Sequence, residues 1–206
     1  SDHGKYRVPL NAPVEGGRNA DGDRHVIAYD RARCKLYELY RAFPKRKRWN
    51  ADSGVIWDLR SAALRPDGWT SADAAGLPIY PGLVKLHEVK RGRIDHAIRV
   101  TFESTRDAWI HPASHCAGDT DSPDVPPMGM RLRLKGGYDI SQVTGQARPI
   151  AEAMKRYGLI VADNGSNCYF QGATNRGWDD DSLDQLKEIP GSAFDVVRSQ
   201  AGADPC

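Results

Sequence analysis

The sequence predicts a mostly β protein with a few helices, arranged as a β-sandwich or a strongly bent antiparallel sheet. Short apolar segments alternate with polar residues, most regularly in Met130–Lys135. Turn-forming residues separate these segments, and the 206 residues include 20 Gly and 13 Pro. Only one stretch, 146–157, has clear helical spacing, through Ile150, Met154 and Tyr157. We expect this helix to pack on the sheet.

The N-terminal part predicts an arm, a hairpin and a third strand. Residues 1–22 are rich in Gly, Asp, Asn and Pro without periodicity, which indicates an extended arm. Residues 25–30 and 34–40 read as two strands joined by the polar turn 31–33. A further strand is expected over 54–59.

The middle of the chain mixes short helices and strands. A helical turn is expected over 69–76, because Thr70 or Ser71 can cap it and Gly76 can end it. Two prolines, 78 and 81, predict an extended segment next. A brief helix over 83–90 and strands over 94–103 and 108–112 should follow.

The C-terminal part predicts another hairpin. Strands 159–162 and 168–171 flank Asp163-Asn164-Gly165-Ser166, which is a strong turn signal. A short helix over 182–189 and a strand over 193–197 complete the pattern. We therefore divide the chain into the arm 1–22, a single β-rich domain 23–198 and a C-terminal tail 199–206.

Composition excludes several classes of protein. The formal net charge is +2, which argues against a nucleic-acid-binding protein. The one dense basic run, Lys45–Arg48, reads as a solvated loop. No apolar run is long enough to span a membrane. The chain begins at Ser1 rather than Met, from which we expect that a leader or a longer N-terminal segment has been removed.

Cysteine usage favours an oxidising compartment. The chain has four cysteines, at positions 34, 116, 168 and 206, which permit three pairings of all four. We expect at least one disulfide and a secreted, extracellular protein. Free buried thiols are the alternative.

Two titratable side chains fall on apolar strand faces. Glu38 falls on the same predicted strand face as Leu36 and Tyr40, and His96 falls on the same face as Ile94 and Ile98. A titratable group on such a face needs a partner or an open cleft, and burial can turn a Glu into a general acid. Each residue is therefore either a catalytic candidate or the holder of a structural hydrogen bond.

Histidines provide a weaker metal hypothesis. His111, His115 and Cys116 lie within six residues, and together with His25 and His96 they offer enough imidazoles for a three-His site on His25, His96 and His115. No second tight ligand pair exists, so we assign no metal ligands. We expect no cofactor, with a metal ion as the alternative.

Carboxylates and tryptophans suggest carbohydrate chemistry. Asp73 and Asp163 are candidate partners of Glu38, since glycosidases use two carboxyl groups. Trp69 and Trp178 lie in predicted loops and could stack on sugar rings, although packing in the core is the plainer role for a tryptophan. The chain contains no nucleotide-binding loop, serine-nucleophile elbow or His-Glu-x-x-His pair.

Four motifs carry a family resemblance over roughly 23–197. They are Thr70-Ser-Ala-Asp-Ala-Ala-Gly-Leu-Pro-Ile-Tyr-Pro-Gly-Leu83, His96-Ala-Ile-Arg99, Pro126-Pro-Met-Gly129 and Tyr157-Gly-Leu-Ile-Val-Ala-Asp-Asn-Gly165. Together they resemble a family of exported, largely uncharacterised bacterial proteins that are often associated with carbohydrate-directed modules. The resemblance implies an additional N-terminal segment or chain, but no reaction. It includes His25, Glu38, Asp73, His96, His115 and Asn164, and it fails at His111 and Cys168.

The leading hypothesis is an enzyme that cleaves an extracellular polysaccharide. In a hydrolase, Glu38 would act with Asp73 or Asp163. In a lyase, His96 or His115 would abstract a proton, with help from Tyr40 and from Arg99, which would neutralise a uronate carboxylate.

We assign Glu38, His96 and His115 as catalytic candidates, and five other residues as substrate-binding candidates: Trp69, Asp73, Arg99, Asn164 and Trp178. The expected partner is a polysaccharide or oligosaccharide. A non-catalytic glycan-binding module and the three-His metal protein are the alternatives.

Overall fold

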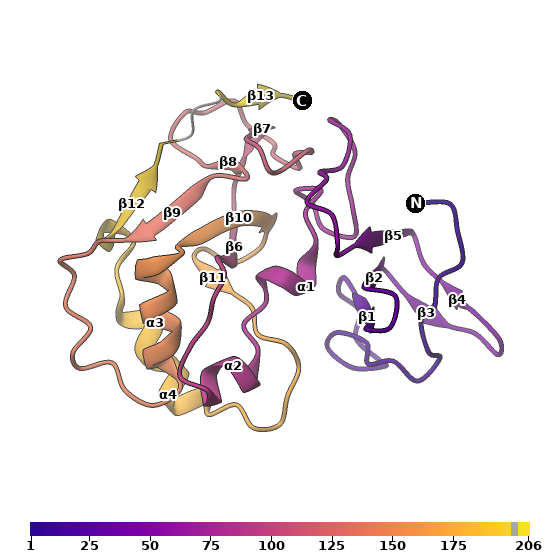
Figure 1. Ribbon diagram of the computed structural model, residues 1–206. Helices are drawn as coiled ribbons and strands as arrows, with labels where there is room; N and C mark the ends of the chain where they lie inside the picture. Colours follow the sequence, from indigo (N-terminus) through magenta and orange to yellow (C-terminus); the bar gives the residue numbers. More distant parts are fainter. Residues whose placement is uncertain (199–201) are drawn as a thin grey trace.

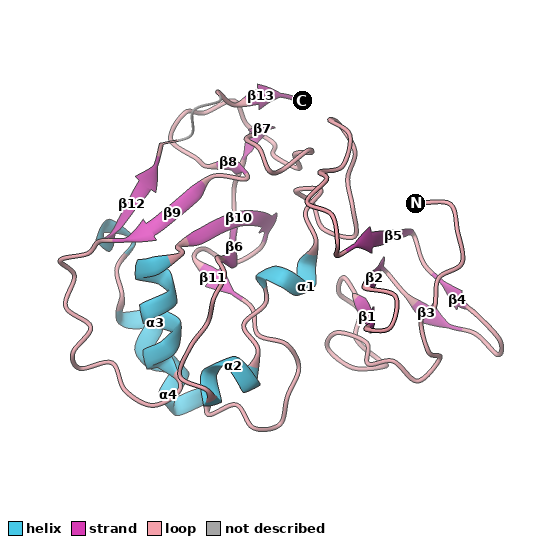
Figure 2. Ribbon diagram, in the orientation of Figure 1, coloured by secondary structure: helices cyan, strands magenta, loops and turns pink. Residues whose placement is uncertain are grey.

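The computed structural model describes residues 1–198 and 202–206. Its strands are β1 (Val26–Asp30), β2 (Lys35–Tyr40), β3 (Phe43–Pro44), β4 (Trp49–Asn50), β5 (Ser53–Asp58), β6 (Ile98–Phe102), β7 (Arg106–Trp109), β8 (Pro127–Met128), β9 (Arg131–Leu134), β10 (Leu159–Asn164), β11 (Tyr169–Phe170), β12 (Phe194–Val197) and β13 (Asp204–Pro205). Its helices are α1 (Ile79–Gly82), α2 (Leu86–Lys90), α3 (Ala147–Arg156) and α4 (Asp180–Asp184), with 3₁₀ turns η1 (Gln185–Glu188) and η2 (Gly191–Ala193). The mostly β prediction with a few helices is confirmed (Figure 2).

Two sheets dominate the architecture. The N-terminal strands form an antiparallel sheet in the order β1-β2-β5. The larger, mixed sheet has the order β11-β6-β10-β9-β12. Smaller sheets join β13-β7-β8 and β3-β4, and the Lys45–Arg48 run forms the turn of the latter hairpin. Figure 1 shows the N-terminal strands on one side, the larger sheet on the other, and α1 between them.

The main core lies between the larger sheet and α3. Ile150 and Met154 on α3 are buried, as the helical spacing predicts, and they share one apolar cluster with Val100, Leu134 and Leu159 from the sheet. This packing confirms the predicted helix over 146–157, within one residue at each end.

The predicted C-terminal hairpin is wrong. Strands β10 and β11 both form, but β6 lies between them, parallel to β10 and antiparallel to β11. The turn is held by β6 itself, because Gly165 N–H donates to the Phe102 carbonyl and the Thr101 hydroxyl donates to the Ser166 carbonyl. Strand β6, whose Ile98 pairs with Leu159 from 61 residues earlier in the chain, thus displaces the local partner.

Two other local predictions need correction. Residues 69–76 form bends and turns instead of a helix, because the Ser71 hydroxyl accepts from Asp73 N–H and donates to the Leu77 carbonyl. The segment expected to be extended contains helix α1, in which Pro81 is the third residue. A proline is tolerated there because the first turn of a helix does not use its N–H groups internally.

Strand β6 is also shorter than predicted. It begins at Ile98, so that His96 precedes the strand and does not share its face. The alternation does hold inside the strand, where Ile98 and Val100 enter the main core while Arg99 and Thr101 point to the opposite side.

Both ends of the chain are tied to the body. The arm 1–22 contains no helix or strand, and Asp2 N–H donates to the Gly54 carbonyl while the Asp2 carboxylate accepts from Ile56 N–H at 3.0 Å. At the other end, Cys206 forms a disulfide with Cys116, which confirms the expected disulfide, and β13 pairs with β7. Within 1–198 and 202–206, no helix has the length and apolar character that crossing a bilayer requires.

The Cys116–Cys206 disulfide should stabilise the fold measurably. Cys206→Ser opens a link between residues 90 apart in sequence, and we expect it to lower the free energy of unfolding by about 2–4 kcal/mol. Cys34→Ser, which changes a free cysteine, is the matched control and should have a small effect. Urea unfolding with and without reductant measures both, and reductant should abolish the difference between wild type and Cys206→Ser.

Candidate functional site

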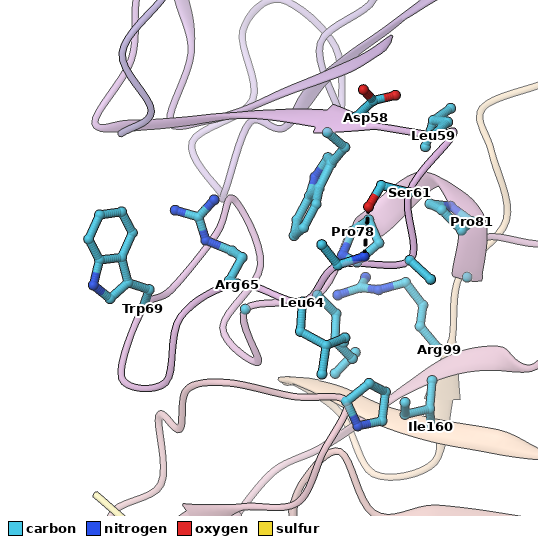
Figure 3. Close-up of a pocket in the computed structure, with 18 of the residues that line it drawn as sticks. Asp58, Leu59, Ser61, Leu64, Arg65, Trp69, Pro78, Pro81, Arg99 and Ile160 are labelled. Atoms are coloured by element: carbon cyan, nitrogen blue, oxygen red, sulfur yellow. Dashed lines mark hydrogen bonds between the residues drawn. The ribbon is translucent and has the colours of Figure 1, made fainter. Parts of the chain in front are cut away.

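A cleft of about 540 Å³ lies between the N-terminal sheet and the larger sheet. One wall comes from β5 and the segment 59–66 that follows it, and the other comes from α1 and the start of β6. Figure 3 shows Leu64 on the segment facing Arg99 and Ile160, whereas the guanidinium of Arg65 points toward Trp69. The volume falls in the range of small-ligand sites in proteins.

Arg65 lies between two tryptophans at the cleft wall. Its guanidinium carbon is 5.7 Å from the ring centroid of Trp57 and 5.5 Å from that of Trp69. Its Nη1 donates to both carboxylate oxygens of Asp2, at 3.1 and 3.2 Å. Trp69 is 54% exposed and stands beside Arg65 in Figure 3. The wall therefore presents an aromatic face next to a planar cation.

Arg99 forms the charged floor of the cleft. Its Nη2 donates to Asp73 and, at 3.4 Å, to Asp163, and its Nη1 donates to Gln171. Although burial acts to lower it, these two carboxylates raise the pKa of Arg99. Burial, only partly offset by Arg99, raises the pKa of Asp73 well above its ordinary value. The neighbouring charge of Asp163 also acts to raise the pKa of Asp73.

Glu38 is fully buried and holds α1 in place. Its carboxylate accepts hydrogen bonds from Ile79 N–H at 2.9 Å, Tyr80 N–H at 2.8 Å and Trp57 Nε1–H at 2.9 Å. The first two donors belong to the N-terminus of α1, which has no other side-chain cap. Burial raises the pKa of Glu38 despite these donors. Glu38 lies behind Trp57 and α1 and does not line the cleft.

His96 reaches the cleft with both ring nitrogens engaged. Nδ1 lies 2.8 Å from the Ala97 carbonyl, and Nε2 lies 3.3 Å from Lys85 Nζ and 3.3 Å from the Glu88 carboxylate. With Nδ1 protonated, Nε2 accepts from Lys85. No ring nitrogen is then open toward the cleft.

The structure does not bring His25, His96 and His115 together. His25 is held by Glu15 at 2.7 Å and by the Ala72 carbonyl at 2.8 Å, while Nδ1 of His115 lies 2.9 Å from the Ala74 carbonyl. Among the residues that the structure describes, the one close group of metal-ligating side chains is Asp107, Cys116 and Cys206, whose cysteines form the disulfide. The three-His metal site is therefore wrong, because the ring nitrogens of these three residues do not lie close enough together to share one ion.

Five sequence-derived candidates lie outside the cleft lining: Glu38, Asp73, His115, Asn164 and Trp178. Asn164 donates to the Thr105 hydroxyl at 3.0 Å, and Trp178 Nε1–H donates to the Ala173 carbonyl at 2.9 Å while its ring joins the main core. Trp69, His96 and Arg99 line the cleft, and Asp73 contacts Arg99 from behind the lining.

A second cavity is larger, at about 1050 Å³. Apolar side chains of the larger sheet and of the region from α4 to η1 line most of it, among them Phe102, Leu132 and Phe194. We place the candidate site in the smaller cleft, because that cleft combines exposed aromatic surface with buried cations.

The sequence did not single out Asp2, Trp57 or Arg65. Asp2 comes from the arm and Arg65 from the segment after β5, so no local pattern connects them. Trp57 could have been noticed, since in the predicted strand 54–59 it lies on the same face as the apolar Val55.

Removing the Glu38 carboxylate should destabilise the protein strongly. Glu38→Ala leaves one buried and two partly buried N–H donors without an acceptor, and we expect a loss of about 3 kcal/mol or more in the free energy of unfolding. Glu188→Ala, at an exposed position, is the control and should change stability by less than about 0.5 kcal/mol. Equal urea midpoints for the two variants would contradict this assignment.

Asp73 should make stability depend on pH. Its folded-state pKa is raised above that of the unfolded chain, so the folded state keeps a proton that the unfolded state loses. The contribution of Asp73 to the free energy of unfolding is complete below about pH 4, near the ordinary pKa of an Asp. This contribution is lost as the pH rises toward the raised pKa of the folded state.

Asp73→Asn cannot ionise, and we expect its unfolding free energy to fall less than that of the wild type between pH 5 and pH 8. Urea titrations across this range measure the effect. Asp121→Asn, at an exposed site, should keep the wild-type slope. Parallel curves for wild type and Asp73→Asn would refute the assignment.

Comparisons with protein-family models, curated protein sequences and solved structures found no match to this chain.

Proposed function

We propose that this protein is a secreted carbohydrate-active protein whose cleft binds a segment of an extracellular polysaccharide. One observation carries the proposal: the exposed face of Trp69 stands beside Arg65 and Asp2 at the wall of a cleft of about 540 Å³. Sugars offer an apolar ring face and a rim of hydroxyl groups. An aromatic face next to a planar ion pair is complementary to both.

The arrangement of the cleft also supports recognition of a ligand. Glu38 fixes the Trp57 indole that flanks Arg65, and Asp2 fixes the guanidinium of Arg65. Arg99 is fixed by three side chains. A site whose side chains are already ordered loses less conformational entropy when a ligand binds.

Export is proposed on two grounds. The Cys116–Cys206 disulfide is compatible with an oxidising compartment. The sequence motifs resemble those of exported bacterial proteins associated with carbohydrate-directed modules.

Polysaccharide cleavage is a second candidate function, favoured by the raised pKa of Asp73. A carboxyl group whose pKa is raised next to another carboxylate is a common arrangement for acid–base chemistry. Binding is better supported, because Asp73 and Asp163 contact each other through Arg99 instead of standing apart across the cleft. Glu38 and His96 direct their polar atoms to protein partners. These contacts support positioning roles for both residues.

The first experiment measures binding and cleavage of neutral and uronic-acid polysaccharides together. We expect retention of at least one polysaccharide in affinity electrophoresis. New reducing ends without ultraviolet absorbance would indicate hydrolysis, and both signals together would indicate elimination. Absence of binding and of both signals across the whole set would contradict the proposed function.

Trp69→Ala should weaken this binding about tenfold, which corresponds to about 1.4 kcal/mol. The substitution removes the exposed ring that we expect to stack on the sugar. Tyr169→Ala is the matched control, because Tyr169 is 58% exposed but lies on β11, outside the cleft. Equal losses in the two variants would show that the cleft is not the binding site.

A further inference from the structure

We infer that the ligand of this cleft is an acidic sugar, and that Arg65 binds its carboxylate. The inference rests on the proposed function and names the substrate class of the same site. It starts from two buried arginines that face one cleft, each with an N–H group that has no protein partner.

Arg65 has an unused hydrogen-bonding edge. Its side chain is only 9% exposed, and Nη1 alone contacts Asp2. Nε is buried and has no acceptor among the described residues. In a planar guanidinium, Nε–H and one Nη2–H are parallel, so this edge fits the two oxygens of a carboxylate. An unpaired buried donor is unfavourable, and a bound carboxylate would relieve that cost.

Other charges in the cleft are already compensated. Asp2 is paired with Arg65 through Nη1, and Asp58 contacts Lys35 at 3.1 Å and Arg60 at 3.2 Å. Hydrogen bonds from Arg60 lower the pKa of Asp58, which keeps it ionised and paired. The carboxylates of the lining therefore do not oppose an incoming anion as free charges would.

Arg99 contributes a single donor from the floor. Its Nη groups are occupied by Asp73, Asp163 and Gln171, and only the buried Nε lacks a partner. This distinguishes the two arginines: Arg65 offers a bidentate edge, whereas Arg99 can donate one hydrogen bond to a hydroxyl or carboxylate oxygen. Arg65 is thus the carboxylate anchor, and Arg99 is an auxiliary contact.

The tryptophans strengthen this preference. Trp57 and Trp69 flank the guanidinium and limit its contact with water, and a charge-assisted hydrogen bond is stronger in such surroundings. A uronic-acid residue would place its ring against the exposed face of Trp69 and its carboxylate on the edge of Arg65. A neutral hexose would leave that edge unpaired.

The test uses matched acidic and neutral ligands. Oligosaccharides prepared from polygalacturonate, alginate and hyaluronan are titrated into the protein by calorimetry, alongside the same oligosaccharides after chemical reduction of their carboxyl groups. We expect at least one acidic oligosaccharide to bind at least tenfold more tightly than its reduced form.

Two variants assign that preference to a residue. Arg65→Lys keeps the charge that pairs with Asp2 but has no bidentate edge, so it should lose most of the tenfold preference while its affinity for the reduced oligosaccharide stays within about twofold. Arg60→Lys, an exposed arginine on the same segment, should keep the preference. Thermal unfolding of each variant verifies that it is folded.

The outcomes separate the two proposals. Equal affinity for acidic and reduced oligosaccharides would overturn the role of Arg65 and leave the sugar-binding cleft standing. A preference that persists in Arg65→Lys would also overturn it. No binding of any oligosaccharide, acidic or reduced, would overturn the proposed function together with this inference.

Discussion

The buried carboxylate of Glu38 is the contact on which the arrangement of the cleft depends. It originates on the central strand of the N-terminal sheet and accepts hydrogen bonds from the first residues of α1 and from Trp57. One side chain thereby joins β2 to β5 and α1, the two elements of this set that line the cleft. A buried carboxylate is unfavourable without such donors, so the fold and the cleft wall are stabilised by the same hydrogen bonds.

A chain of contacts leads from Glu38 to the cleft surface. The Trp57 indole donates to Glu38, and its ring flanks Arg65, whose other side faces Trp69. Asp2, brought in by the N-terminal arm, fixes the far end of the guanidinium. The order of Arg65 therefore depends on residues from three separate parts of the sequence. This explains how a segment without regular structure, 59–66, can present an arginine in a defined position.

Beneath the cleft, a second buried cluster joins the loop at Asp73 to the larger sheet. Arg99 on β6 contacts Asp73 and Asp163, and the charges of Glu38 and His25 lie near enough to influence this cluster. The cluster is thus well suited to hold the cleft floor rigid, and it explains how a polar floor can exist among apolar side chains.

The sequence by itself determined the local elements and the burial of particular residues. Alternation identified the N-terminal hairpin, β9 and the buried position of Glu38, and helical spacing identified α3, because these patterns express a periodicity of the backbone. The sequence also identified Trp69, Arg99 and Asp73 as residues of interest. It assigned Arg99 to the face of its strand opposite the core.

Only the tertiary structure decided which distant segments meet. The insertion of β6 between β10 and β11 overrode a strong local turn signal. The tertiary structure also decided that Asp2, Trp57 and Arg65 meet, that His25, His96 and His115 stay apart, and that Cys116 pairs with Cys206. Such contacts join residues far apart in sequence, and no local periodicity of the backbone encodes them.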